Sequence, residues 1–309
     1  MLEFYQAIWR VTGKRQILLL VLSVAVSALA AVPLDYQKRI INGLGGDLTQ
    51  ETLVRLAIEM GAFILLSLGL KWLLGYQSGT LGEWVIKRLR TVVCENAIDR
   101  TARDGVGPKR GTLANMISSE TETIGKFVGS AVSEPVVQFG TLISIVGYIA
   151  VTQPRLGLVV MLIVAPQAII VLLTQTRINA LVAERVRVLR QSINTITAED
   201  ISAARQSILE DFDRIYDARR RIFIWKLSTK FVLSALNGVG MAAVLLIGGL
   251  LVLDGRGDVG TVVAATAGLG RIQQPWRLLI GFYRNLATTT VQYELFRDVL
   301  PKAGEPGAR

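Results

Sequence analysis

The sequence predicts an all-α integral membrane protein with six transmembrane helices and long helical extensions on the cytoplasmic side. Hydrophobic residues make up 51% of the 309 residues and gather in long apolar stretches. Each stretch, with its flanks, is long enough to cross a hydrocarbon core of about 30 Å as a helix. The connections alternate between long ones rich in Lys and Arg and short ones nearly free of them. We expect residues 1–300 to form one transmembrane domain with spans at 16–35, 56–76, 130–153, 156–176, 230–253 and 259–282.

The spans differ in the charge they carry. The first, third, fourth and fifth have uncharged cores, whereas the second contains Lys71 and the sixth contains Arg271. The amphipathic segment Leu2–Trp9 precedes the first span, and we expect it to form an interfacial helix ahead of a span that is retained. Residues 301–309, rich in Gly and Pro, are predicted to form a flexible tail.

Positive charge predicts the orientation. Of the 34 Lys and Arg residues, 27 lie on the side of the long connections and 5 on the opposite side. By the positive-inside rule both termini are then cytoplasmic, and we expect a multi-pass protein of the bacterial inner membrane. The net charge of +10 is explained by attraction to anionic lipid on that leaflet, so no nucleic-acid partner is predicted.

Composition excludes several kinds of chemistry. The chain has no His and one Cys, Cys94, so it offers neither a disulfide framework nor a Cys/His metal site, and no Ser-His-Asp or Cys-His nucleophile. Gly13-Lys14 and Gly125-Lys126 lack the spacing of a phosphate-binding loop. We therefore predict that the chain is not an enzyme and binds no cofactor of its own.

Each of the two long cytoplasmic connections is predicted to form a helical hairpin, because both far exceed the roughly 2 to 8 residues that a helix connection needs. In the first, a helix over Glu83–Arg103 meets the breaker cluster 104–111, and a second helical pattern begins at Thr112. In the second, helices over 178–196 and 201–221 flank a cap at 197–200.

Four stretches in this order resemble the transmembrane domain of ABC exporters, in which six helices continue into the cytoplasm and carry two coupling helices at their tips. The resemblance covers the whole chain through short, degenerate motifs. The chain departs from the family pattern at Asn42, where Asp is common, and at Met116, Glu120, Asp200 and Glu294. The four stretches are Pro33–Leu44, Gly111–Glu122, Asp200–Arg205, and Gly260–Ala265 followed by Gln274–Leu279.

The resemblance implies a membrane-spanning exporter subunit that works as a homo- or heterodimer. ATP and Mg²⁺ would be bound by an ABC ATPase subunit or domain on another chain, because this one has no phosphate-binding loop. An alternative is an ABC-like scaffold or assembly factor that does not transport. Contacts with the ATPase are implied for the tip residues Thr112, Leu113, Met116, Glu120, Glu199, Asp200, Ile201 and Ala203.

Polar side chains inside the spans indicate a substrate path, since an unpaired charge at the bilayer centre costs about 2.5 to 3.5 kcal/mol. Gln273 and Arg277 fall on one face of the sixth span, and Arg271 falls nearly opposite Gln273. We expect a cavity on one face and a helix or dimer contact on the other. The candidates are Lys71, Arg271, Gln273, Gln274 and Arg277.

Two small-residue motifs, Gly75-x-x-x-Gly79 and Gly125-x-x-x-Gly129, have the spacing that lets two helices approach closely. Because the chain contains 29 glycines, such spacings also arise by chance. The spacing alone therefore does not establish that either motif packs against a neighbouring helix.

Overall fold

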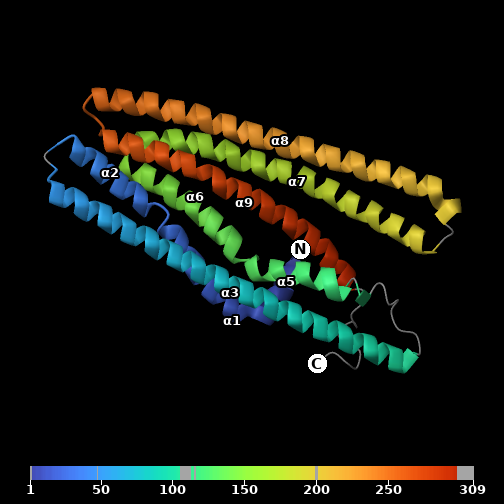
Figure 1. The fold of residues 1–309 in the computed structure, drawn as a ribbon. Helices are drawn as coiled ribbons and strands as arrows, with labels where there is room; N and C mark the ends of the chain where they lie inside the picture. The colour runs from blue at the N-terminus through green and yellow to red at the C-terminus, as the bar shows by residue number, and fades with distance from the viewer. Residues whose placement is uncertain (1, 47, 105–112, 115, 199–200, 298–309) are drawn as a thin grey trace. The chain divides into compact units, whose positions relative to one another are not determined.

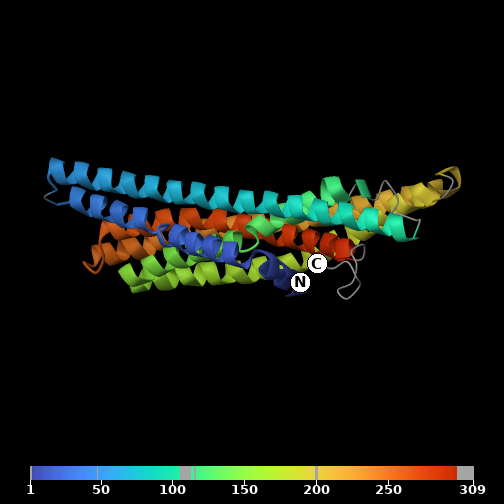
Figure 2. The same cartoon turned by 90° about the horizontal axis from the view of Figure 1, so that it is seen from below.

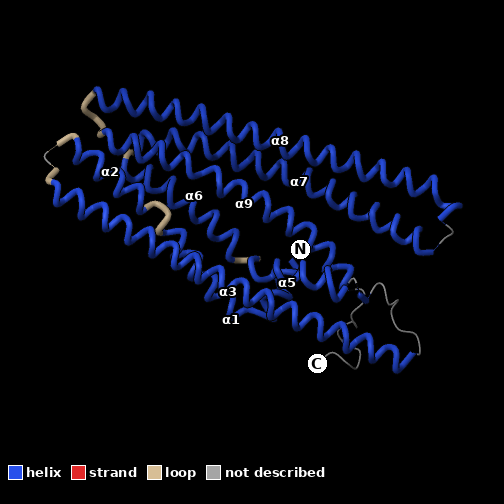
Figure 3. The backbone as a smooth tube through the Cα atoms, in the orientation of Figure 1, coloured by secondary structure: helices blue, strands red, loops and turns tan. Residues whose placement is uncertain are grey.

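The computed structural model describes residues 2–46, 48–104, 113–114, 116–198 and 201–297. This part of the chain is helical throughout, with short connections and no strand (Figures 1 and 3). The predicted all-helical fold class is therefore confirmed. The helices are α1 (Leu2–Ala28), α2 (Val32–Leu44), α3 (Gln50–Asp104), a π-helical turn (Met116–Glu120), α5 (Thr121–Ser130), α6 (Ser133–Thr152), α7 (Pro154–Ala198), α8 (Ile201–Leu253) and α9 (Val259–Arg297).

Five helical stretches among the described residues are long and apolar enough to cross a membrane. The sixth predicted span lies in α9 and is not one of the five. Arg271, Gln273 and Gln274 lower the hydropathy of that helix below the level of the others. The five stretches are Phe4–Leu44, Gln50–Ile98, Met116–Thr152, Pro154–Ile193 and Arg205–Leu253.

The first predicted span, 16–35, is interrupted. Helix α1 ends at Ala28 and α2 begins at Val32, with Pro33 in its first turn. Proline lacks a backbone N–H, and its ring clashes with the carbonyl four residues earlier, so a continuous helix is disfavoured here. The segment Leu2–Trp9 is not a separate interfacial helix either, because α1 runs through it without a break.

The chain forms two compact units, and α3, α6 and α9 each contribute residues to both. Unit 1 comprises residues 1–28, 65–140 and 288–309, and unit 2 comprises residues 29–64 and 141–287.

In unit 1 the apolar face of the N-terminal segment is covered by protein. Phe4 and Ile8 are buried, and the Phe4 ring lies 5.8 Å from that of Phe127 and 4.8 Å from that of Tyr293. Further along α1, the Gln16 side-chain amide donates to the Val128 carbonyl at 3.1 Å. Burial against aromatic side chains, rather than insertion into a lipid surface, accounts for the amphipathic pattern of this segment.

Of the two small-residue motifs, only Gly125-x-x-x-Gly129 lies at a close helix contact. A Cβ on Gly125 would overlap the Ile86 side chain, and one on Gly129 would overlap the Ser78 carbonyl oxygen of α3. The Ser78 hydroxyl in turn donates to the Gly129 carbonyl at 2.9 Å. No heavy atom of a neighbouring element lies within 4 Å of a Cβ built on Gly75 or Gly79.

Unit 2 is built around a buried apolar cluster to which α2, α6, α7, α8 and α9 all contribute. Helices α7 and α8 run side by side as the two arms of a long hairpin (Figures 1 and 2). Toward the tip, the buried hydroxyl of Ser192 on α7 donates to the buried carboxylate of Asp211 on α8 at 2.8 Å. A buried carboxylate needs such partners, and this bond fixes the register of the two arms.

A polar cluster begins α9 and ties it to α2. Asp258 accepts hydrogen bonds from the Thr261 backbone amide at 2.7 Å and from the Asn42 side-chain amide at 2.6 Å. The Asn42 carbonyl oxygen accepts from the Gly260 amide at 2.7 Å, and the Lys38 ammonium lies 3.8 Å from the Asp258 carboxylate. Two of the unpaired amides at the start of α9 are thus satisfied.

The surrounding cluster changes the pKa of the Asp258 carboxyl group. Partial burial acts to raise the pKa of Asp258, but the hydrogen bonds from Asn42 and Thr261 and the charge of Lys38 outweigh it and lower the pKa. The ionised carboxylate therefore stabilises the fold at neutral pH. This contribution is lost only as the pH falls through the lowered pKa.

Candidate functional site

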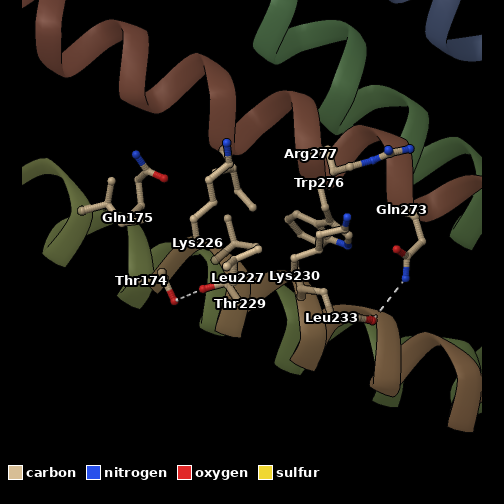
Figure 4. A pocket seen from close by; sticks show the side chains of 13 residues that line it. Thr174, Gln175, Lys226, Leu227, Thr229, Lys230, Leu233, Gln273, Trp276 and Arg277 are labelled. Carbon is tan, nitrogen blue, oxygen red and sulfur yellow. Dashed lines mark hydrogen bonds between the residues drawn. The ribbon is translucent and has the colours of Figure 1, made fainter. Parts of the chain in front are cut away.

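A pocket of about 590 Å³ lies within unit 2, between α7, α8 and α9. Its lining residues fall at 171–178, 226–233 and 273–280, which are the predicted cytoplasmic ends of the fourth, fifth and sixth spans. Figure 4 shows the three helices and the side chains that line the pocket. Its volume lies within the range of small-molecule sites.

The lining carries positive charge and no negative charge. Lys226 and Lys230 come from successive turns of α8, and Arg277 comes from α9. Both lysine side chains extend from α8 toward α9 (Figure 4). None of the lining residues is Asp or Glu. Since all three cations keep exposed surface, the pocket offers hydrated positive charge that an anion can reach.

Two buried side chains in the lining have polar atoms without a partner among the described residues. Trp276 is 4% exposed, and its indole N–H finds no acceptor. Gln175 is also 4% exposed, and its carbonyl oxygen accepts no hydrogen bond, although its amide donates to Asn179 at 2.9 Å. Most buried polar atoms in proteins are paired, so a donor and an acceptor left open beside one pocket indicate a ligand site.

Other polar groups of the pocket are already satisfied and hold its walls together. The Gln273 side-chain amide on α9 donates to the Leu233 carbonyl on α8 at 3.2 Å (Figure 4). The Thr229 hydroxyl on α8 lies 3.2 Å from that of Thr174 on α7. These contacts place α8 against both other helices, so the walls of the pocket are fixed without a ligand.

The five predicted path residues do not all come together. Gln273 and Arg277 line the pocket, whereas Gln274 and Arg271 are exposed on α9 outside its lining. Lys71 is exposed on the part of α3 that belongs to unit 1. The pocket thus lies on the face of α9 that carries Gln273 and Arg277, and the role of Arg271 stays a prediction.

The tip residues proposed to meet an ATPase are only partly described. Leu113 and Glu120 are half-buried, and Met116 is 2% exposed, so its side chain packs inside unit 1. Ile201 and Ala203 lie in the first turn of α8. Thr112, Glu199 and Asp200 lie outside the described residues.

Among the lining residues that sequence reasoning missed, Lys226, Lys230, Trp276 and Gln175 supply positive charge or open polar atoms. The lysines were counted only as cytoplasmic charge, although their i, i+4 spacing at the start of the fifth span places them on one helix face. Gln175 is a polar residue at the end of the apolar fourth span, and this position was its signal in the sequence. For Trp276 the sequence offers no signal that separates a lining side chain from a core one.

Two comparisons with known proteins bear on this fold and site. The sequence model of one protein family, described as the ABC transporter transmembrane region, matches residues 16–276, which is most of the chain. No curated protein matches it.

Proposed function

Because the chain belongs to the family of ABC transporter transmembrane regions, we propose that it is the exporter subunit that forms the substrate pathway, with the pocket between α7, α8 and α9 as part of that pathway. The observation that carries this proposal is a cavity with open polar groups at the predicted inner ends of three membrane helices. A substrate would enter it from the cytoplasm or the inner leaflet.

Transport would be driven by an ATPase on another polypeptide. The chain itself has no phosphate-binding loop, and pairing with nucleotide-binding domains is implied by the family. The contact would be made by the hairpin tips, at Leu113 and Glu120 and at the start of α8. Closure of the ATPase would then move packed helices relative to one another. We further propose a dimer of such subunits in the bacterial inner membrane.

The coupling contact is tested by substitution at the second tip. Affinity purification of the tagged full-length protein from its native membranes should recover a polypeptide with an ABC phosphate-binding loop. Ala203→Trp should reduce this recovery at least tenfold, because a large side chain in the first turn of α8 would block docking. The amount of inserted protein should not change. Recovery is measured by quantitative mass spectrometry.

Phe223→Trp is the matched control, since it places the same side chain on an exposed part of α8 about 30 Å from the tip. It should recover the ATPase normally. The proposed coupling is wrong if the unmodified protein recovers no such ATPase. It is also wrong if Ala203→Trp recovers as much ATPase as Phe223→Trp. The first of these results would favour the scaffold alternative.

The proposed orientation makes a separate prediction. Because positive charge is concentrated on the long connections, Cys94 should react with a membrane-impermeant thiol reagent only from the cytoplasmic side. In a Cys94→Ser background, a cysteine at Gly107 should behave in the same way, and one at Gly46 or Gly257 should react only from outside. Labelling of Gly107→Cys from outside would contradict the six-span topology.

A further inference from the structure

We propose that the pocket between α7, α8 and α9 binds an amphiphile that has an anionic head group and an apolar chain. The inference rests on the proposed function, because it names the substrate class of the same cavity. It is carried by the charge of the lining, by its open hydrogen-bonding atoms and by the order of polar and apolar residues along the helices.

The head group is selected by charge. Lys226, Lys230 and Arg277 give the pocket three cations and no lining carboxylate to neutralise them. An anion with several oxygen atoms, such as a phosphate monoester, can accept hydrogen bonds from more than one of them. A cationic or zwitterionic head group would bring a positive charge into the same place.

The open atoms of Trp276 and Gln175 add a hydrogen-bonding pattern. The buried indole N–H of Trp276 is a donor for an anionic oxygen. The buried carbonyl oxygen of Gln175 is an acceptor, which suits a hydroxyl group on the ligand rather than a second anion. A head group that combines an anionic oxygen with a hydroxyl would satisfy both atoms.

The apolar chain of the ligand is selected by the deeper part of the pocket. Lys226 and Leu233 both line it and lie about 10 Å apart along α8. Leu233 is buried, and so is Val171, which lines the pocket from α7. The cytoplasmic end is therefore cationic and the membrane end is largely apolar. A molecule lying with its head at the inner interface and its chain in the bilayer matches that polarity.

The inference is tested by binding to the full-length protein in dodecyl maltoside, with complexes counted by native mass spectrometry. Three probes separate the contributions of head and chain: dodecyl phosphate, dodecylphosphocholine and inorganic phosphate. Dodecyl phosphate should bind saturably and at least tenfold more tightly than either of the others. A tenfold difference corresponds to about 1.4 kcal/mol.

Lys230→Gln and Arg277→Gln should each weaken dodecyl phosphate binding about tenfold. Arg221→Gln removes the same charge from an exposed site of α8 outside the pocket and should leave binding unchanged. All three side chains are exposed, so the variants should fold, and thermal unfolding checks that they do.

Equal binding of dodecyl phosphate and dodecylphosphocholine would overturn the proposed head group. Binding of inorganic phosphate as tight as that of dodecyl phosphate would overturn the amphiphile, and unchanged binding in both lining variants would overturn the pocket as its site. The titration needs no ATPase. Its failure therefore concerns the ligand class alone, whereas failure to recover an ATPase concerns the proposed coupling.

Discussion

Replacing Gly129 with valine should destabilise unit 1 by about 3 kcal/mol. A Cβ at this position overlaps the Ser78 carbonyl oxygen, and a backbone atom inside a helix cannot move aside as the end of a side chain can. Relief requires α3 and α5 to separate, which also breaks the 2.9 Å hydrogen bond from the Ser78 hydroxyl to the Gly129 carbonyl. We expect a lower midpoint of thermal unfolding in detergent and less protein in the membrane.

Gly79→Val is the matched control for this prediction. It adds the same side chain to α3, at a site where a Cβ meets no heavy atom of a neighbouring element within 4 Å. Gly129→Ala gives a smaller overlap and keeps the effect measurable if the valine variant does not accumulate. The proposed close packing of α3 and α5 would be refuted by a Gly129→Val protein that unfolds at the same temperature as Gly79→Val.

The second large effect is expected for Asn42→Asp. In the structure the Asn42 amide donates to the Asp258 carboxylate at 2.6 Å, so an aspartate at position 42 would replace a donor by a second carboxylate. Two carboxylates this close cannot both stay ionised without mutual repulsion. At pH 7.5 the variant should lose about 2 to 3 kcal/mol, because it loses a hydrogen bond to a charged group and gains a repulsive contact.

The stability lost by Asn42→Asp should become smaller as the pH falls, whereas the stabilisation by the Asp258 carboxylate in the unmodified protein is lost at low pH. The variant pair would hold one proton with a raised pKa, so the folded state binds more protons than the unfolded state and stability rises as the pH falls from 7.5 to 5. Because its pKa is lowered, Asp258 contributes no pH dependence to the stability of the unmodified protein between pH 5 and 7.5. Unfolding midpoints at the two pH values measure the difference.

Asn42→Ala separates the lost hydrogen bonds from the added charge. It should be destabilised equally at both pH values, because it introduces no titrating group. An Asn42→Asp protein whose deficit is the same at pH 7.5 and pH 5, or that shows no deficit at all, would mean that the carboxylates do not meet.

The sequence predicted the helices well because the signals that specify them are local. Glycine and proline at 104–111 mark the end of α3. Short polar breaks between uncharged runs separate α6 from α7 and α8 from α9. The family followed from the order of four degenerate motifs and is confirmed. The break between α1 and α2 was missed, although Pro33 was its visible cause, because hydropathy continues across it.

The site could be predicted only where polarity interrupts an apolar run. Gln273 and Arg277 stand out in α9 for that reason, whereas Lys226 and Lys230 sit in a charged segment, where their i, i+4 spacing is not enough to mark a site. Contacts between residues far apart in the sequence could not be predicted from it. Asn42 looked like a departure from the family pattern, and only its pairing with Asp258, 216 positions away, explains why an amide suits this position.

The length of the α7–α8 hairpin determines how far its tip moves compared with the pocket when the hairpin tilts. Helix α7 has 45 residues and is therefore about 68 Å long. If it tilts by about 5° around its start at Pro154, its far end moves by about 6 Å, whereas Gln175, roughly halfway along, moves by about 3 Å. The hydrogen bond between Ser192 and Asp211 links the two arms near the tip. Such a rotation would move the pocket about half as far as the tip of the hairpin.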